Sequence, residues 1–396
     1  MKRVIMSLSL LLFALSYSAS SQTNFKPIVV KFDYDGHIYI KCKINDTLEA
    51  NLLFDTGANG LLLDEDYFNS TGIPIVRSQL SQLPGAGSTP QIITVVLDRM
   101  VVNLDTIKFV PPYVPLMKLR CIVGEKADGI IGPDFLLPYF TRIDFTKKKI
   151  MLYTNEDITK GYESIKLDVL NHRFYLPIEV STKEGILIKG NSQLDLGYGG
   201  TLNLTSPTGI KYQLEKKVKN IARYFNDRGG AGGRIEGFAF RASTIKIGKY
   251  KISMPDVDVS TDTAGALSKS NHIGLLGNSI LERFDIIVNF KTGVFYCKPN
   301  GKLKNSFSSN LTGFFYVNNS NTENALVING LFKGGNAEKA GVKVQDKILA
   351  INGVKVSLLS TKDIKKLFKK KEKTLKLTIL SGLEKKTLKL ELKESI

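Results

Sequence analysis

The sequence predicts a mostly β fold in which one β-rich unit occurs twice and a smaller α+β unit follows. Three observations support this prediction. Short runs of β-branched and aromatic residues, broken by Gly, Pro, Asn and Asp, recur along the 396 residues. A set of short motifs occurs twice in the same order. The pattern then changes after residue 310, where helical and strand-like stretches alternate. The apolar fraction of 43% is typical of a globular protein and excludes extensive disorder.

The repeat is carried by three markers. They are an Asp followed two residues later by Gly (55–57 and 195–197), a Gly-Ala-Gly run (85–87 and 230–232), and two apolar residues before a Gly (130–132 and 275–277). The second and third markers recur after 145 residues, and the two Asp residues are 140 apart. Such regular spacing indicates a duplicated unit. We predict β-rich units over residues 24–158 and 162–300.

The third unit is predicted over residues 311–394, after a polar linker at 301–310. Strands are expected at 311–316, 325–328, 346–351, 374–380 and 387–392, with helices at 336–341 and 361–371. Ser360, with Asp363 three residues later, is typical of a helix N-terminus. The Asn352-Gly353 pair predicts a tight turn after the third of these strands.

The N-terminus has the pattern of a secretory signal. A short basic start is followed by an apolar run over residues 4–15 and then by small residues, so we expect residues 1–20 to be removed. The run is too short for a membrane anchor, and no later segment is long and apolar enough to span a bilayer. Cys42, Cys121 and Cys297 could include one disulfide in an exported protein or could all be free thiols.

Composition argues against several other classes of protein. The net charge of +18 is large, but the basic residues form no motif interleaved with aromatic residues, so we expect no nucleic-acid partner. The three His and three Cys residues lack metal-ligand spacing, and no metal or cofactor is expected. The glycine-rich stretch at 229–233 lacks the Lys-Ser/Thr ending of a phosphate-binding loop.

The residues around Asp55 indicate a specific chemistry. An apolar stretch at 51–54 predicts a strand that ends at Asp55, and Gly57 permits the sharp turn that leaves the carboxyl facing a cleft. Hydrolysis by a water molecule that a carboxyl activates needs two carboxyls that share one proton. Asp195, at the same place in the second copy of the repeat, is the candidate partner.

These motifs resemble those of a known family. Asp-Thr-Gly-Ala at 55–58, Gly-Ala-Gly at 85–87 and Ile-Ile-Gly at 130–132 resemble the catalytic loop, flap tip and core segment of retropepsin-type aspartic peptidases. The second copy repeats the pattern in the same chain, as in pepsin-like enzymes. Residues 311–394 resemble a bacterial PDZ domain. The whole chain is similar to exported bacterial aspartyl proteases with a C-terminal PDZ domain. The resemblance implies a bilobal, acid-protease-type pair of β-barrels.

The resemblance also implies which residues form the site. Asp55 and Asp195 would be catalytic, supported by Thr56, Gly57 and Gly197. Two flaps would cover the substrate, with tips at Gly85, Ala86, Gly87, Gly230, Ala231 and Gly232. Leu196 departs from the family, which has Thr or Ser at this position, and a leucine cannot make the hydrogen bond that braces the two loops.

In the PDZ-like unit, the resemblance implies a groove for a peptide C-terminus between the second strand of that fold and its long helix. Backbone N–H groups at 312–315 would hold the carboxylate. The predicted groove residues are Gly313, Phe314, Phe315, Ile364, Leu367 and Phe368. The same aromatic and aliphatic side chains could instead form the core of this small unit.

Three functions follow from these expectations. The first is an exported aspartic endopeptidase, active as a monomer in the periplasm, in the cell envelope or outside the cell, that cleaves peptide or protein substrates. The second is an inactive envelope protein that keeps the fold and binds peptides, with Leu196 marking the loss of catalysis. The third is an enzyme in which the first unit pairs with the first unit of a second chain. The repeat argues against this last arrangement.

Overall fold

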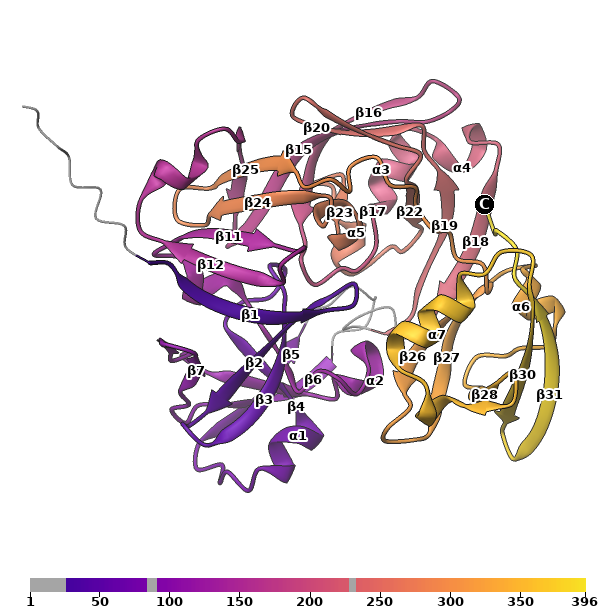
Figure 1. The fold of residues 1–396 in the computed structure, drawn as a ribbon, viewed down its shortest axis with the longest axis horizontal. Coiled ribbons are helices and arrows are strands. Elements are labelled where there is room, and N and C mark those ends of the chain that lie inside the picture. The colour runs from indigo at the N-terminus through magenta and orange to yellow at the C-terminus, as the bar shows by residue number, and fades with distance from the viewer. Residues whose placement is uncertain (1–25, 84–90, 228–232) are drawn as a thin grey trace, which may run out of the picture.

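The computed structural model describes residues 26–83, 91–227 and 233–396 as a mostly β protein with short helices. We divide it into a first segment (β1 to β12), a second segment (β13 to β25) and a third segment (β26 to β31), coloured from indigo through orange to yellow in Figure 1. The predicted signal at 1–20 and the predicted flap tips at Gly85, Ala86, Gly87, Gly230, Ala231 and Gly232 lie outside the described residues. Neither prediction is tested here.

The first segment is built from short strands with two small helices. Its strands are β1 (Ile28–Tyr34), β2 (Ile38–Ile44), β3 (Leu48–Phe54), β4 (Leu61–Asp64), β5 (Ser78–Leu83), β6 (Gln91–Val96), β7 (Val102–Leu104), β8 (Ile107–Phe109), β9 (Val114–Met117), β10 (Gly129–Ile131), β11 (Phe140–Asp144) and β12 (Lys149–Tyr153). Its helices are α1 (Glu65–Ser70) and α2 (Arg120–Val123).

The second segment has a similar composition of elements. Its strands are β13 (Glu163–Lys166), β14 (Asp168–Leu170), β15 (Arg173–Ser181), β16 (Leu187–Leu194), β17 (Leu202–Leu204), β18 (Ile221–Asn226), β19 (Ile235–Arg241), β20 (Thr244–Ile247), β21 (Tyr250–Ser253), β22 (Asp256–Ser260), β23 (Gly274–Leu276), β24 (Phe284–Asn289) and β25 (Val294–Pro299). Its helices are α3 (Ser206–Lys211), α4 (Leu214–Lys217) and α5 (Asn278–Leu281).

The third segment contains the strands and helices expected from the sequence, with shifted ends. They are β26 (Phe314–Asn319), β27 (Ala325–Phe332), α6 (Asn336–Lys339), β28 (Lys347–Ile351), β29 (Val354–Lys355), α7 (Thr361–Phe368), β30 (Thr374–Ser381) and β31 (Glu384–Glu391). The Ser360 hydroxyl accepts a hydrogen bond from the Asp363 N–H and so caps α7 as predicted. Asn352 and Gly353 both have positive φ, in agreement with the predicted turn between β28 and β29.

The first two segments use the same strand pairing around their Asp-containing loops. In the first, β10 lies parallel to β3 and antiparallel to β4. In the second, β23 lies parallel to β16 and antiparallel to β17. These pairings are made by the apolar-apolar-Gly markers found in the sequence, which place a buried strand beside the strand that leads to each Asp. The pattern of pairing is therefore the same on both sides of the site.

One antiparallel strand pair joins the first two segments into a continuous sheet. Strand β11 pairs with β24, with Arg142 opposite Ile287. Beside this junction the Arg142 guanidinium donates hydrogen bonds to both carboxylate oxygens of Asp285 at 2.9 and 2.6 Å, and the Tyr162 hydroxyl donates to the same carboxylate. A bidentate Arg–carboxylate pair fixes the relative orientation of its two side chains more tightly than a single hydrogen bond does. It holds the two segments in one orientation.

The hydrophobic core is shared across the same junction. One cluster of buried side chains includes Phe54 and Ile131 from the first segment and Leu194, Leu276 and Ile286 from the second. A separate cluster fills the third segment.

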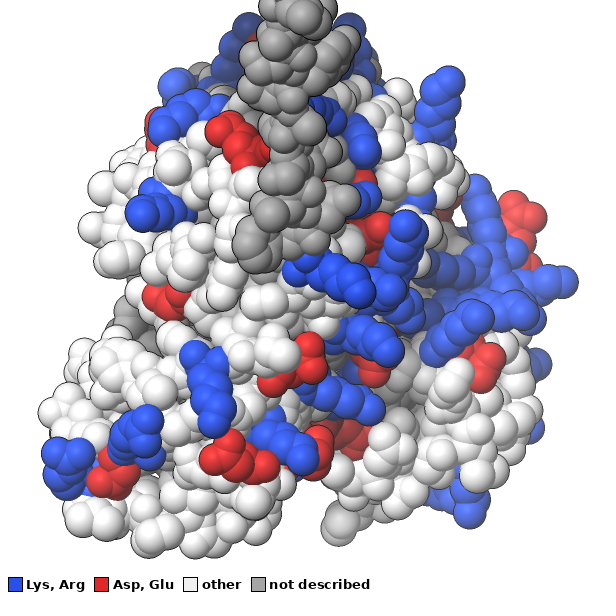
Figure 2. All heavy atoms as spheres, turned by 60° about the vertical axis from the view of Figure 1, so that its left-hand side comes forward, with Lys and Arg blue, Asp and Glu red and all other residues white. Residues whose placement is uncertain are grey.

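The thiols of Cys42 and Cys297 are free and buried. None of the helices among the described residues is long and apolar enough to cross a membrane. Figure 2 shows one face of the molecule, on which Lys and Arg side chains are numerous and Asp and Glu side chains lie among them.

The third segment continues the sheet of the second. The free end of β27 pairs with β18, so that Tyr224 lies opposite Phe332 and Asn226 opposite Gly330 (Figure 1). At Gly330 the strands approach so closely that a Cβ atom would lie 2.4 Å from the Phe225 carbonyl oxygen. A glycine is required at this position because any side chain would separate the strands.

The third segment also contacts the first. The Glu125 N–H donates to the Asn318 carbonyl on β26 at 3.3 Å, and the Glu125 carboxylate accepts hydrogen bonds from the Asn321 and Thr322 N–H groups. The Lys365 ammonium of α7 donates to the Asp35 carbonyl in the turn between β1 and β2. The third segment is thus attached on two sides, to β18 and to two loops of the first segment.

We predict that Gly330→Ala will weaken the attachment of β27 to β18, because the added methyl group has no space beside Phe225. Hydrogen–deuterium exchange would report the change. The Lys333 N–H and the Asp227 N–H, which bond across this junction at 2.8 and 2.7 Å, should exchange faster than in the wild type. The Gln345 N–H, which bonds to Ile328 within the third segment, is the internal control. Unchanged protection of both junction amides would contradict the prediction.

Candidate active site

The two candidate Asp residues lie at equivalent places in their segments. Asp55 follows β3 and Asp195 follows β16. Their N–H groups donate to the Ile131 and Leu276 carbonyls, both at 3.0 Å, on the strands that carry the apolar-apolar-Gly markers. The buried strands therefore fix the backbone immediately before each carboxyl. The structure brings together two loops that are 140 residues apart in the sequence.

Within each loop, a glycine N–H holds the carboxylate. The Gly57 N–H donates to Asp55 Oδ1 at 2.6 Å, and the Gly197 N–H donates to Asp195 Oδ1 at 3.0 Å. The two carboxyls lie beside each other, since a Cβ atom on Gly57 would be within 3.5 Å of an oxygen of each. Asp55 is partly buried and Asp195 is only 9% exposed. Two acids are thus held face to face in a site with little access to water.

This arrangement raises the pKa values of both carboxyls. Burial raises the pKa of Asp195 well above its usual range, and the neighbouring Asp55 charge raises it further. Burial also raises the pKa of Asp55, whereas the Gly57 N–H, the Asp195 side chain and the Arg173 charge act in the opposite direction. Two buried carboxylates this close repel each other, so the pair holds one proton between its two members.

The two supporting glycines are required by the space around the pair. A Cβ atom on Gly197 would lie 2.3 Å from the Asp55 carboxyl carbon. A Cβ atom on Gly57 would lie 2.9 Å from Asp55 Oδ1 and 3.5 Å from Asp195 Oδ2. Each glycine thus borders the carboxyls of the pair, and any larger residue at Gly197 would displace the Asp55 side chain.

Thr56 braces the loops across the junction of the two segments. Its hydroxyl donates to the Leu194 carbonyl at 2.6 Å and accepts from the Leu196 N–H at 3.0 Å. Leu196 is fully buried and, as expected from the sequence, returns no hydrogen bond from its side chain. The bracing that Thr56 provides to the second loop is therefore not reciprocated by Leu196.

Sequence reasoning missed three residues near the pair. Asn278 donates to the Leu196 carbonyl, Arg173 donates to the Asn59 carboxamide, and the Tyr198 hydroxyl donates to Asp258 at 2.9 Å. Burial raises the pKa of Asp258 to about 6. Tyr198 and Asn278 lie inside or directly after motifs that were recognised, but no residue pattern shows that their side chains face the loops. Arg173, the first residue of β15, had no signal in the sequence.

In the third segment, the predicted groove lies between β26 and α7, and its own side chains fill it. Phe368 packs edge-on against both Phe314 and Tyr316, with ring centroids 5.4 Å apart in each case. Phe314 and Ile364 are almost completely buried in the core. At the far end, the Asn318 side chain donates to the Thr361 hydroxyl and so bridges the strand and the helix. Phe314, Ile364 and Phe368 are therefore core residues in this structure.

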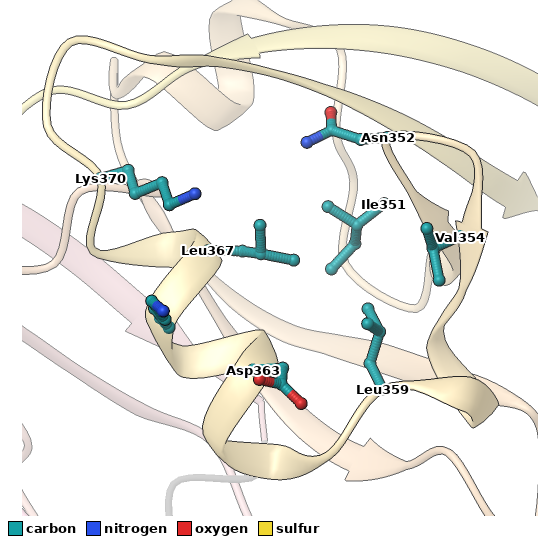
Figure 3. Close-up of a pocket in the computed structure, with 8 residues that line it drawn as sticks. Ile351, Asn352, Val354, Leu359, Asp363, Leu367 and Lys370 are labelled. Carbon is teal, nitrogen blue, oxygen red and sulfur yellow. The ribbon is translucent and has the colours of Figure 1, made fainter.

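Two residues predicted for the groove lie elsewhere. Phe315 points to the other face of β26, where it stacks on Phe332 at 5.1 Å and contacts Tyr224 of the second segment. Its neighbour Phe314 occupies the inner face because side chains alternate along a strand. Leu367, directly before Phe368 on α7, lines a pocket of about 310 Å³ beside Ile351 and Val354 (Figure 3). Spacing on the helix alone could not decide between these faces.

The loop expected to bind a carboxylate is also occupied by the chain itself. The Asn310 carboxamide oxygen accepts hydrogen bonds from the Thr312 and Gly313 N–H groups, both at 3.0 Å. Gly313 has a φ of +76°, which favours glycine, and Asn336 lies directly against it. A peptide carboxylate would have to displace the Asn310 side chain to reach these donors.

Comparison with known proteins identifies two of the segments. Residues 40–135 match the family model described as aspartyl protease, and residues 302–380 match the model described as PDZ domain. These matches confirm the predicted combination of an aspartyl protease domain and a C-terminal PDZ domain, and a PDZ domain binds peptide ligands. No curated protein matches the chain.

A solved structure, described as a retropepsin-like aspartic protease from Rickettsia conorii, is 18% identical to this chain. The similarity covers 32% of this chain and 89% of that protein, with a TM-score of 0.25. At this level of similarity the match carries no argument about the present site.

We predict that Asp195 makes stability fall as the pH rises. Because its pKa is raised in the folded state, the unfolded chain loses this proton first, and folding is increasingly penalised from about pH 4 up to the folded-state pKa. Asp195→Asn removes the penalty. In urea unfolding followed by circular dichroism, the stability of the variant relative to the wild type should increase between pH 4 and pH 8. Parallel pH curves for the two proteins would contradict this.

Proposed function

We propose that this chain, with its aspartyl protease domain and PDZ domain, is an aspartic endopeptidase that hydrolyses peptide bonds through a water molecule activated by Asp55 and Asp195. The observation that carries the proposal is the adjacent pair of carboxyls supplied by two equivalent loops, each held by a glycine N–H. The proposal places one water molecule between the two carboxyls. The proposal places both catalytic groups in one chain, so a monomer suffices.

We infer further that the first and second segments are lobes of a duplicated unit, each closing into the barrel expected from the family resemblance. The inference is supported by the equal strand pairing around β10 and β23 and by the matching hydrogen bonds of Asp55 and Asp195. It also disfavours pairing of the first segment with a second chain. The second segment already occupies the place that such a partner would take.

In the proposed mechanism Asp55 is the ionised member of the pair and Asp195 is the protonated member. Charged Asp55 takes a proton from the water, and the water oxygen forms a bond to the carbon of the scissile carbonyl. Asp195 gives its proton to the carbonyl oxygen, so a neutral tetrahedral intermediate forms. The intermediate then collapses, the C–N bond breaks, and the proton held by Asp55 passes to the leaving nitrogen. Asp195 recovers a proton from the intermediate, which restores the pair.

Substrate would bind in an extended conformation across the two loops. Strands β5 and β6 form a hairpin that ends at the predicted flap tip, and β18 and β19 form its counterpart in the second segment. Among the described strands, β5 pairs only with β6, so its outer edge is available to a peptide backbone. The corresponding edge of β18 is already paired with β27. We therefore expect a substrate backbone to pair with the edge of β5 and not with β18.

The PDZ domain is proposed to bind a peptide C-terminus and so to deliver substrates or to regulate the cleft. In this structure its groove is filled by Phe368 and its carboxylate loop is bonded to Asn310. A ligand must therefore open a closed groove. The proposed setting is the periplasm, the cell envelope or the outside of the cell, in line with the signal-like N-terminus.

An alternative function is an inactive peptide-binding protein with the same fold. Leu196 favours this alternative, because the second loop lacks the hydroxyl that the family provides. The Gly197 N–H, which holds the Asp195 carboxyl beside Asp55, favours the enzyme. Cleavage assays separate the two.

We predict that Asp55→Asn and Asp195→Asn will each lower peptide cleavage by about 10²- to 10⁴-fold, the range expected when a general acid or base is removed. A digest of a peptide library analysed by mass spectrometry would measure this. Asp346→Asn is the matched control, since Asp346 is a buried aspartate of the PDZ domain that should not affect cleavage. If the wild type cleaves nothing under any condition, the inactive alternative holds.

We predict that Leu196→Thr will leave cleavage per folded molecule unchanged or raise it, because the new hydroxyl can return the bracing that Thr56 provides. The buried leucine will be missed, however, and stability should fall by about 1 to 3 kcal/mol. Activity and the free energy of unfolding would be measured on the same sample. A sharp fall in kcat would show that packing by Leu196 matters more to the loop than a hydroxyl.

A further inference from the structure

The two loops of the proposed active site are braced unequally. Thr56, from the first loop, bonds to both the Leu194 carbonyl and the Leu196 N–H of the second loop. Leu196 is in the equivalent position of the second loop and is fully buried, but it has no polar group to offer in return. The second loop receives hydrogen bonds from Thr56 but makes none from the side chain of Leu196. Such a buried loop needs another contact to keep its carboxyl in place.

Asn278 makes such a contact. It lies directly after Gly277, at the start of α5, and is completely buried. Its Nδ2 atom donates to the Leu196 carbonyl at 2.8 Å, and its own N–H donates to the Tyr198 carbonyl at 2.8 Å. The second loop is therefore held at two points, one residue and three residues after Asp195.

The second hydrogen of the same Nδ2 crosses to the first segment. It donates to the Gly36 carbonyl at 3.0 Å, in the turn between β1 and β2. In that turn, His37 lies against Gly199 of the second loop, where a Cβ atom would be 2.9 Å from the imidazole. Thr56 thus reaches from the first segment to the second loop, and Asn278 reaches from the second segment to the first. Together they connect the segments in both directions.

The arrangement of hydrogen bonds also fixes the orientation of the Asn278 side chain. If the carboxamide were turned over, its oxygen would face the Leu196 and Gly36 carbonyl oxygens. All three oxygens are hydrogen-bond acceptors, so no hydrogen bond could form and they would repel one another. In the orientation observed, Asn278 Oδ1 is buried and has no hydrogen-bond partner among the described residues. The side chain therefore acts here as a donor, at the expense of its own acceptor.

The first segment has no counterpart to Asn278. The residue after its Ile-Ile-Gly marker is Pro133, which has no side-chain donor. The first segment needs no such side-chain donor, because its loop carries the Thr56 hydroxyl. The donor thus occurs only in the segment whose loop lacks a hydroxyl.

We propose that Asn278 is a positioning residue that replaces the missing hydroxyl of the second loop. By holding the Leu196 carbonyl, it directs the Asp195 carboxyl toward Asp55, and through Gly36 it ties that loop to the first segment. The inference rests on the proposed peptidase activity and deepens it, since it names what allows a loop with Leu196 to keep a working pair.

The test compares two asparagines whose Nδ2 groups each donate to two backbone carbonyls. Asn278→Leu removes both bonds with little change in size. Asn300→Leu is the matched control, because Asn300 Nδ2 also donates to two carbonyls, those of Glu282 and Phe284, away from the loops. In peptide cleavage assays, Asn278→Leu should lower kcat about 10- to 100-fold with KM nearly unchanged, whereas Asn300→Leu should leave kcat within about twofold.

A rescue experiment separates positioning from general stability. In the double variant Asn278→Leu with Leu196→Thr, the new hydroxyl should restore most of the lost kcat, although two buried residues have been changed. Thermal unfolding of every variant would be measured in parallel. If Asn278→Leu does not fold, Asn278→Ser, which is too short to reach either carbonyl, takes its place.

Two outcomes would overturn the proposal. One is a kcat for the Asn278 variant no lower than that of Asn300→Leu, and the other is a loss of kcat that Leu196→Thr does not restore at all. Asp55→Asn is measured in the same assay. If that variant keeps full cleavage, the proposed peptidase mechanism fails, whatever the Asn278 variant does. If it is inactive and Asn278→Leu is fully active, only the positioning role is wrong.

Discussion

The constraint on which the site depends is the repulsion between two carboxylates placed face to face away from water. Asp55 and Asp195 can remain together only if one of them keeps a proton. The surroundings of the two carboxyls meet this condition because they place no large side chain beside the pair and admit little water. Gly57 and Gly197 leave space for the carboxyls while their N–H groups orient them, and the residue directly before each Asp, Phe54 or Leu194, is fully buried. A small displacement of either loop would change the contact between the two carboxyls and, in the proposed mechanism, the position of the attacking water.

Much of this arrangement could be predicted from local sequence. The strand, the Asp and the turning glycine form one short motif, and the second copy of the repeat pointed to Asp195 despite its weaker match. The buried strand beside each Asp was also marked by sequence, as an apolar pair before a glycine. These features depend on residues close together in the chain, so their pattern survives as a readable signal.

The features that escaped prediction depend on distant residues. Asn278 and Gly36 are 242 positions apart, and nothing in the residue before or after Asn278 shows that its amide spans two segments. Phe315 and Leu367 were placed in the groove by analogy, but their faces are decided by contacts with β18 and β28 that local spacing does not contain. Asn310, which occupies the carboxylate loop, lay in what the sequence indicated was a linker. The predicted helix at 361–371 was also too long, since α7 ends at Phe368.

The PDZ domain is bonded into the rest of the molecule and is not a freely tethered module. Strand β27 supplies the neighbour of β18, and the aromatic cluster of Tyr224, Phe315 and Phe332 covers the seam. A chain shortened to end near residue 300 would therefore leave an apolar β-strand without its neighbour, exposed to the solvent. Open edges of this kind recruit strands from other molecules. Aggregation of such a truncated protein would result from the exposed edge of β18. It would not show whether peptide recognition by the missing domain is needed for hydrolysis.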